Sequence, residues 1–384
     1  MGEAAYRDCV ETTFENFRQY DQFVEITSSW EQFLTDTYAS LHYQFQFYRF
    51  PEHNIASGSS TLSPDFSVLF NDSYAVTFLV YHEMPRSKSD FEAVLETIED
   101  YDQELAFKMD MQTIVPETQD IAVLISNENS QTAQYRLNEA LDSGGLSLNS
   151  NLVILDYRYV DPDVAPKYRF QRMAMVGDNF RDESLPSRLQ ISTKFSMDGG
   201  GFDSLQLDVF DIHERKATGV LCNKRPNNLY LASYLWHMVF RDRLDDGQEV
   251  IWQQEDPRKT IELEIDTDTL IDELNGDYIP GGRLDPEWLI SAFEYLCEAE
   301  LAERISEQEF RVDYRNLTDK PREYNDIVTD PNGISHLAGL FAEFHCENEV
   351  EMDDRDFARL TDADTANEST QIDEDLTQPE IGDF

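Results

Sequence analysis

The first part of the chain, residues 1–175, shows both hydrophobic periods that mark regular secondary structure. Within residues 91–107, apolar side chains recur at positions 91, 94, 95, 98, 101 and 105, the stripe of an amphipathic helix. Short apolar runs bounded by polar turns predict strands at 63–70, 75–82, 120–127 and 151–160. The last two runs are continuous, which is typical of strands buried on both faces. This order of elements predicts an α/β domain with a mixed sheet.

Two local signals predict where helices begin. Ser29 is followed three residues later by Gln32, a capping box that predicts a helix from Trp30 to about Phe47. Asp285 stands directly before Pro286, a good N-cap residue followed by the residue that best fits the first helical position. A second helix is therefore expected to begin at residue 286.

Residues 226–346 predict a second domain with another order of elements. A capped helix covers 229–240, and a short strand follows at 260–266. Gly276 is expected to stop a short helix that begins near residue 267. The remaining elements are a helix, a strand and a last helix, at 286–300, 309–314 and 334–346.

Two further stretches lack a regular pattern. Residues 176–225 include the run Met197-Asp198-Gly199-Gly200-Gly201 and are expected to form a connector, with a hairpin around 202–213. Residues 347–384 are strongly acidic and carry few apolar anchors, so this tail is expected to be disordered.

The charge of the chain changes what can be said about its partners. With 77 acidic and 30 basic residues, the formal charge is -47, and acidic residues are spread along the whole sequence. Dense carboxylates and few lysines are typical of halophilic proteins from a high-salt, haloarchaeal-type cytoplasm, where salt screens their repulsion. An acidic mesophilic protein, such as a DNA mimic, is the alternative. On a surface this acidic, a nucleic-acid site is expected only as a local island of basic residues.

The four cysteines are Cys9, Cys222, Cys297 and Cys346, and no CxxC pair is present. This scatter argues against a disulfide framework and against a structural zinc site, although His345 and Cys346 are adjacent. No apolar run approaches the roughly 20 residues of a membrane span. We therefore expect a cytoplasmic protein.

The hairpin at residues 63–84 carries the first candidate for chemistry. Pro64-Asp65 opens one strand, and the next strand ends in Tyr81-His82-Glu83. With the helix at 91–107, this hairpin resembles the core of the PD-(D/E)xK nuclease superfamily. The resemblance implies a restriction-endonuclease-like α/β fold with Asp65 as a metal ligand. It also matches Tyr101 to the family helix that often carries a Gln and a Tyr.

The resemblance is incomplete where the chemistry should be. Val80 and His82 stand where the family has the Glu and Lys of its second motif. Two carboxylates are needed to hold Mg²⁺, which prefers oxygen ligands, and valine cannot replace one. Glu83 points to the opposite face of a regular strand. The sequence therefore favours a nuclease-like fold without nuclease chemistry and without a cofactor. A working nuclease with a migrated site of Asp65, His82 and Glu83, holding Mg²⁺, is the alternative.

Residues 226–346 resemble winged-helix domains in their order of helices and strands. In a DNA-reading winged helix the third helix enters the major groove. Here that helix is expected to bury Leu289, Ala292, Phe293, Leu296 and Cys297. Its other side is expected to show Glu287, Ser291, Glu294, Tyr295 and Glu298. Because carboxylates repel phosphates, this domain is expected to dock a protein partner, and a winged-helix transcription regulator is a further alternative.

The richest basic stretch precedes the second domain and is the candidate for binding nucleic acid. It comprises Arg215, Lys216, Lys224 and Arg225. Scattered salt-bridge partners are the other interpretation of these residues. The sequence thus favours an inactive, nuclease-like interaction protein in a DNA-linked process such as repair, defence or the life of a mobile element. That process is implied by the resemblance alone.

Overall fold

The structure is a computed structural model, and it divides into two units by contacts within the chain. Unit 1 comprises Met1–Phe17, Leu231–Ile265 and Ile290–Phe384, and unit 2 comprises Arg18–Tyr230 and Asp266–Leu289. The domain boundaries predicted at residues 175 and 226 do not coincide with this division. The described residues are 2–38, 45–49, 53–54, 61–62, 64–70, 74–109, 112–160, 167–175, 204–208, 224–250, 259–278, 284–315, 317 and 333–349.

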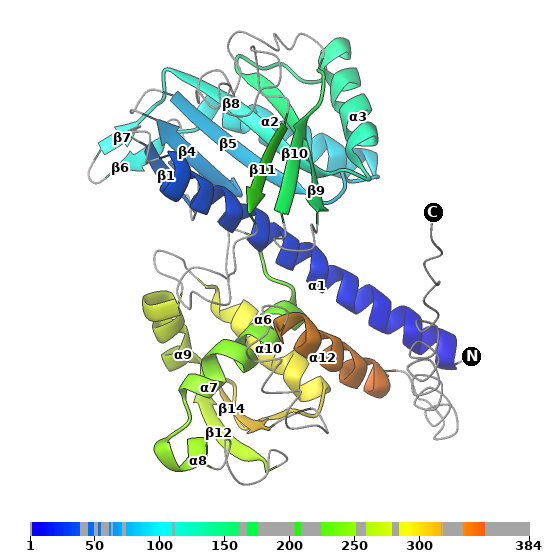
Figure 1. Cartoon of the computed structure of the whole chain (residues 1–384), viewed down its shortest axis with the longest axis vertical. Coiled ribbons are helices and arrows are strands. Elements are labelled where there is room, and N and C mark those ends of the chain that lie inside the picture. The colour runs from blue at the N-terminus through cyan, green and yellow to red at the C-terminus, as the bar shows by residue number, and fades with distance from the viewer. Residues whose placement is uncertain are drawn as a thin grey trace, which may run out of the picture. The chain divides into compact units, whose positions relative to one another are not determined.

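Unit 2 is built on a curled, seven-stranded mixed sheet with the order β1-β4-β5-β8-β9-β10-β11 (Figure 1). The strand pairs β5–β8 and β8–β9 are parallel. The pairs β1–β4, β4–β5, β9–β10 and β10–β11 are antiparallel. The strands are β1 (Phe45–Tyr48), β4 (Phe66–Phe70), β5 (Tyr74–Tyr81), β8 (Thr118–Ser126), β9 (Asn151–Val160), β10 (Lys167–Arg172) and β11 (Ser204–Asp208). The predicted mixed α/β class is confirmed, as are the strands predicted from apolar runs.

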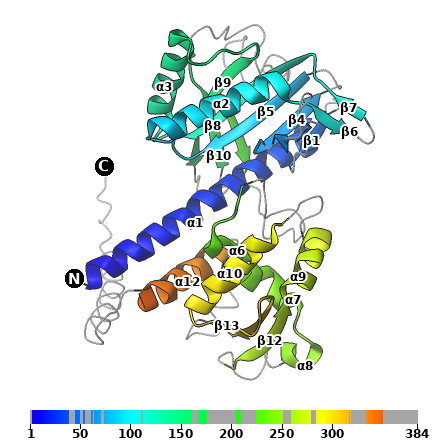
Figure 2. The same cartoon turned by 180° about the vertical axis from the view of Figure 1, so that it is seen from behind.

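Helices cover both faces of this sheet. α2 (Lys88–Glu104) and α3 (Ser130–Ser143) pack on one face, where Figure 2 shows α2 lying across the strands. On the other face, the Trp30 ring of α1 lies 5.0 Å from the Phe78 ring and 5.4 Å from the Phe170 ring. The parallel strands are buried on both sides, which explains their continuous apolar runs. The predicted helix at 91–107 corresponds to α2.

The N-terminal helix differs from the prediction. α1 (Gly2–Gln32) runs straight through Ser29, and a π-helical turn, η1 (Phe33–Tyr38), follows it. Ser29 is buried within the helix, so the expected capping box is wrong, and Phe45 lies in β1 instead of a helix. The local sequence at Ser29 matches a helix cap, but the apolar face of α1 that packs on the sheet continues both before and after Ser29. Despite its length, α1 is not apolar enough to cross a bilayer, and neither is any other described helix.

A small second sheet in unit 2 has the order β3-β2-β6-β7. Its strands are β2 (His53–Asn54), β3 (Thr61–Leu62), β6 (Phe107–Met109) and β7 (Gln112–Ile114). Within the stretch expected to be a connector, β11 pairs with β10 as an edge strand of the large sheet. Apart from β11 and residues 224–225, this stretch lies outside the described residues. The expected disordered tail also lies outside them from residue 350 onward.

The chain after residue 226 forms several helices and a three-stranded sheet, and all of this sheet except Asp266 belongs to unit 1. The sheet order is β12-β14-β13, with β13 and β14 antiparallel. In chain order the elements of this region are α6 (Asn228–Tyr234), η4 (Leu235–Val239), α7 (Phe240–Asp242), α8 (Asp246–Val250), β12 (Ile261–Asp266), α9 (Thr267–Glu273), η6 (Leu274–Tyr278), α10 (Pro286–Glu298), β13 (Ala302–Arg304), β14 (Glu309–Tyr314) and α12 (Gly333–Glu349). Gly276 does not stop its helix, which continues as η6 to Tyr278.

α10 begins as predicted, and its buried side is largely the predicted one. Asp285 Oδ1 accepts the Glu287 N–H at 2.8 Å, and Phe293 is fully buried. Tyr295, expected on the open side, is also buried: its hydroxyl donates to the Phe341 carbonyl of α12 at 3.3 Å. No local signal in α10 predicts that α12 covers this part of it. Cys297 is half-buried, with a free thiol.

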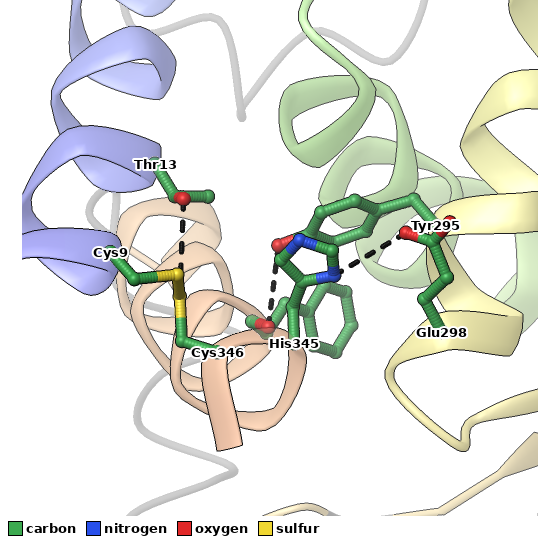
Figure 3. The surroundings of a disulfide bond; sticks show 7 residues. Cys9, Thr13, Tyr295, Glu298, His345 and Cys346 are labelled. Atoms are coloured by element: carbon green, nitrogen blue, oxygen red, sulfur yellow. Dashed lines mark hydrogen bonds and ion pairs between the residues drawn. A yellow bond between two sulfur atoms is a disulfide. The ribbon is translucent and has the colours of Figure 1, made fainter. Parts of the chain in front are cut away.

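Two of the four cysteines form a disulfide that the scatter of cysteines did not predict. Cys9 of α1 and Cys346 of α12 form a disulfide within unit 1, across a sequence separation of 337 residues (Figure 3). The spacing of cysteines says nothing about which helices will meet, and these two come together only through the fold. The bond also removes Cys346 from any zinc site. A cross-link between such distant residues stabilises a protein mainly by restricting its unfolded chain.

Candidate functional site

The β4–β5 hairpin buries the carboxylate of Asp65. Its backbone N–H donates to the Phe78 carbonyl at 3.2 Å, just before β4 begins. Its Oδ2 atom accepts the Val80 backbone N–H at 2.6 Å. Only 3% of Asp65 is exposed to solvent. Val80 therefore contributes its backbone to this site, although its side chain is no ligand.

A lysine from a distant part of the sequence completes this site. Lys224 Nζ lies 2.8 Å from Asp65 Oδ2 and also donates to the Val80 carbonyl. The ammonium group sits 4.6 Å from the centroid of the Phe23 ring and 5.1 Å from that of Tyr81, within the range of cation–π attraction. The buried carboxylate is thus neutralised by a cation of the same chain.

Burial dominates the titration of the groups around Asp65. Burial raises the pKa of Asp65 above its usual range, although the Lys224 ammonium and the Val80 N–H both act to lower it. Burial also raises the pKa of Tyr81 and of Tyr101, and the negative charge of Asp65 adds to both shifts. The charge of Asp65 therefore acts on Tyr101 of α2 as well as on Tyr81.

His82 and Glu83 do not join Asp65 as metal ligands. The His82 backbone carbonyl accepts a hydrogen bond from Ser126 Oγ at 2.7 Å. The Nδ1 atom of the His82 ring is buried without a hydrogen-bond partner among the described residues. Glu83 is exposed and pairs with Arg86 at 3.0 Å. The described part of the chain holds no group of three or more His, Cys, Asp or Glu side chains placed to bind a metal.

The residues around Asp65 fit a divalent metal poorly. Mg²⁺ requires several oxygen ligands in octahedral geometry. Among the described residues Asp65 supplies the carboxylate here, and its Oδ2 oxygen already accepts hydrogen bonds from Val80 N–H and Lys224 Nζ. A metal ion at this oxygen would have to displace a like charge. In the part of the chain that the structure describes, this arrangement suits a buried ion pair better than a divalent metal.

A second polar cluster lies between α1 and the sheet. The Tyr168 hydroxyl donates to Glu25, and the Tyr157 hydroxyl donates to the Tyr81 carbonyl at 3.1 Å. Burial and the neighbouring Glu25 raise the pKa of Asp21 well above its usual value. Through Tyr81, this cluster adjoins the site of Asp65 and Lys224.

The structure describes only two of the four residues of the predicted nucleic-acid island. Arg215 and Lys216 lie outside the described residues. Lys224 is committed to Asp65, and Arg225 is exposed with an interaction partner of its own. The prediction for Arg215 and Lys216 therefore stays open, while Lys224 has a structural partner that the sequence could not indicate.

Replacing Lys224 by Met should destabilise the protein in a pH-dependent way. Removing one partner of a fully buried ion pair costs about 3–5 kcal/mol, and we expect about 2 kcal/mol at pH 7 because water screens this lysine. The Lys224 side chain is 41% exposed. Without the ammonium, the pKa of Asp65 rises further. A raised carboxyl pKa favours folding at low pH, so the loss should shrink as pH falls and Asp65 becomes protonated.

Urea unfolding in molar KCl at several pH values measures this effect. Lys88→Met is the matched control, because the Lys88 side chain is 87% exposed and pairs with Glu92 only at the surface. The double change Asp65→Asn and Lys224→Met should recover most of the lost stability, since it leaves no buried charge. A Lys224→Met protein as stable as Lys88→Met at neutral pH would contradict this description.

Sequence reasoning singled out Asp65 and Tyr101 in the hairpin region, but it named Lys224 only as a candidate for binding nucleic acid and not as a partner of Asp65. The aspartate follows a proline at the start of an apolar strand, which is a local signal. Lys224 lies far along the chain in a stretch without periodicity, so no spacing links it to the hairpin. Compared with known proteins, the chain matches no protein-family model, no curated protein and no solved structure.

Proposed function

We propose that the chain is a catalytically inactive, nuclease-like interaction protein that acts in a DNA-linked process. The observation that carries the proposal is the pairing of Asp65 with Lys224 at 2.8 Å. The strand order β1-β4-β5-β8, with α2 between β5 and β8, supports the nuclease-like fold. Within that fold, the oxygen that would hold a metal holds an ammonium group instead.

One observation favours the alternative of a working nuclease. Lys224 brings to Asp65 the ammonium group that His82 does not supply on the strand. In a metal-dependent site, however, that lysine must stand beside a metal held by two carboxylates. The described residues offer Asp65 alone, and Lys224 bonds to the very oxygen that would be a ligand. The inactive site is therefore the better-supported proposal.

A cleavage assay tests the proposal directly. With the full chain in about 2 M KCl, where phosphate contacts are weak but folding is favoured, we expect no cleavage of single- or double-stranded DNA. Mg²⁺ and Mn²⁺ are supplied in turn, because both prefer the oxygen ligands of such a site. The readout is the size of labelled DNA after incubation. Metal-dependent cleavage that disappears in Asp65→Ala would establish the nuclease alternative.

The region after residue 226 supports a docking role. Helix, strand, two helices and a β13–β14 hairpin follow one another as in winged-helix domains. The basic residues of the hairpin are already paired: Arg304 Nη1 lies 2.7 Å from Glu294, and Arg311 Nη1 lies 3.2 Å from Glu303. Glu298 adds another exposed carboxylate. This surface repels phosphates and suits a protein partner with a basic surface.

Changing Glu294 and Glu298 to Gln should barely alter stability. Both are exposed, and such substitutions usually stay within about 0.5 kcal/mol each. We expect the same urea midpoint as for the unaltered chain, together with weaker capture of a basic protein partner. Glu262→Gln with Glu264→Gln, on the exposed face of β12, is the control with the same change of charge. Sequence-specific DNA binding that the α10 changes alter would instead support the transcription-regulator alternative.

A further inference from the structure

Two arginines stand directly opposite each other on neighbouring strands of unit 2. Arg158 of β9 and Arg169 of β10 are register partners. On the other edge of β10, Gln206 of β11 is the register partner of Arg169. Like charges in such cross-strand pairs destabilise a sheet. Among the described residues, neither guanidinium has a hydrogen-bond or ion-pair partner. A repulsion between side chains that no nearby interaction offsets is typical of a functional position.

The face that carries these arginines is open. Side chains two residues apart share a face of a strand, so Leu152, Ile154, Asp156 and Arg158 point the same way. Leu152 and Ile154 lie in the core under α2 and α3, whereas Arg158 is exposed and Arg169 is half-buried. The core therefore ends after Ile154, and the sheet continues beyond its helices.

The acidic side chain of Asp156, two residues before Arg158 on the same face, does not neutralise the pair. Asp156 is about nine-tenths buried, and its Oδ2 atom accepts Asn127 Nδ2 at 2.9 Å. In the described part of the chain it forms no ion pair with either arginine. The two guanidinium groups thus keep their charge and their donors for a ligand.

The arginine pair is unusual for this chain. Acidic residues outnumber basic ones by 77 to 30, and several basic residues elsewhere in the described part of the chain are held by carboxylates. Examples are Arg49 with Glu31, Arg86 with Glu83, Lys88 with Glu92, Lys224 with Asp65, and Arg304 with Glu294. Two unpaired arginines side by side make a positive patch in a negative field, and its complement is an anion.

We propose that the open face of β9 and β10 binds the phosphate backbone of nucleic acid, with Arg158 and Arg169 as the contacts. Guanidinium groups match phosphate oxygens with two parallel hydrogen bonds. Cross-strand neighbours have Cα atoms about 5 Å apart, so both side chains reach one phosphate or two successive ones. This inference rests on the proposed DNA-linked function and names its ligand. The contact positions the strand without reading its sequence.

The test is binding of labelled single-stranded and duplex oligonucleotides of mixed sequence to the full chain, with EDTA present. KCl is varied from about 0.5 to about 2 M, and affinity is plotted against salt on logarithmic axes. For the double variant Arg158→Gln with Arg169→Gln we expect at least a tenfold loss, about the value of a charged hydrogen bond. The salt slope should fall by about one for each arginine. The melting temperature should not fall, because the change removes a repulsive pair.

Arg86→Gln with Lys88→Gln is the matched control, since it removes two exposed positive charges that are already paired. Unchanged affinity in the arginine-pair variant, equal losses in both variants, or no binding by the unaltered chain would overturn the inference. Displacement of the oligonucleotide by poly-aspartate at equal charge would also overturn it, in favour of an acidic protein ligand. Binding accompanied by metal-dependent cleavage would contradict the proposed inactivity and leave this inference standing.

Discussion

At tens of millimolar salt, the protein is expected to lose its cooperative unfolding transition, while in molar KCl it should unfold cooperatively. With a formal charge of -47, folding concentrates a large negative charge in a small volume. Repulsion acts over about 30 Å at 0.01 M salt but over only about 3 Å at 1 M. Removing salt therefore exposes the folded state to repulsion across the whole molecule.

The surface of β12 shows this repulsion at close range. Its side chains alternate between buried and exposed, and every exposed position, Glu262, Glu264 and Asp266, is acidic. Positions two apart on a strand are separated by about 7 Å, which is inside the screening length of dilute salt and outside that of molar salt. Thermal unfolding followed by circular dichroism across a KCl series measures the effect.

Sucrose provides the control for the salt series. It strengthens burial of apolar surface by exclusion from the protein but carries no charge. If screening is the cause, sucrose in dilute buffer should not restore the transition, whereas KCl should. A melting temperature that stays the same from millimolar to molar salt would refute the halophilic interpretation of the composition.

Elements whose signal is local were predicted well. β8 and β9 are continuous apolar runs, and α2 carries a helical stripe, so the pattern within each segment predicts the element. The β4–β5 hairpin has a polar turn between two apolar runs. Asp285 and Pro286 mark the start of α10 in the same local way. In all these cases the hydrophobic period and the capping chemistry agree with the packing.

Features that depend on distant contacts were missed. The capping box at Ser29 was overridden because α1 has a sheet to pack on, and no sequence window contains that sheet. Cys9 meets Cys346 only because α1 and α12 come together. Lys224 reaches Asp65 only through the folded chain. The candidate site therefore divides into a predictable carboxylate and an unpredictable cation, and the cation decides what the site can do.

Shortening Phe293 to Ala should cost about 3–5 kcal/mol of unfolding free energy, the usual loss for a fully buried aromatic side chain. The Phe293 ring stacks on Phe310 at 4.8 Å between centroids and lies 5.9 Å from Phe240. All three rings are fully buried within unit 1. The substitution leaves a cavity lined by two aromatic rings from other elements, which cannot close it without moving a helix or a strand.

Urea unfolding in molar KCl measures the loss, because guanidinium chloride is itself a salt and would change the screening of the carboxylates. Phe293→Leu keeps more of the volume and should lose clearly less than Phe293→Ala, since the cost of such changes grows with the cavity left behind. The exposed Glu294→Gln, one residue further on, should stay within about 0.5 kcal/mol of the unaltered chain. If Phe293→Ala were no more damaging than Glu294→Gln, α10 would not be packed through this ring. The docking surface proposed for its opposite side would then lose its structural basis.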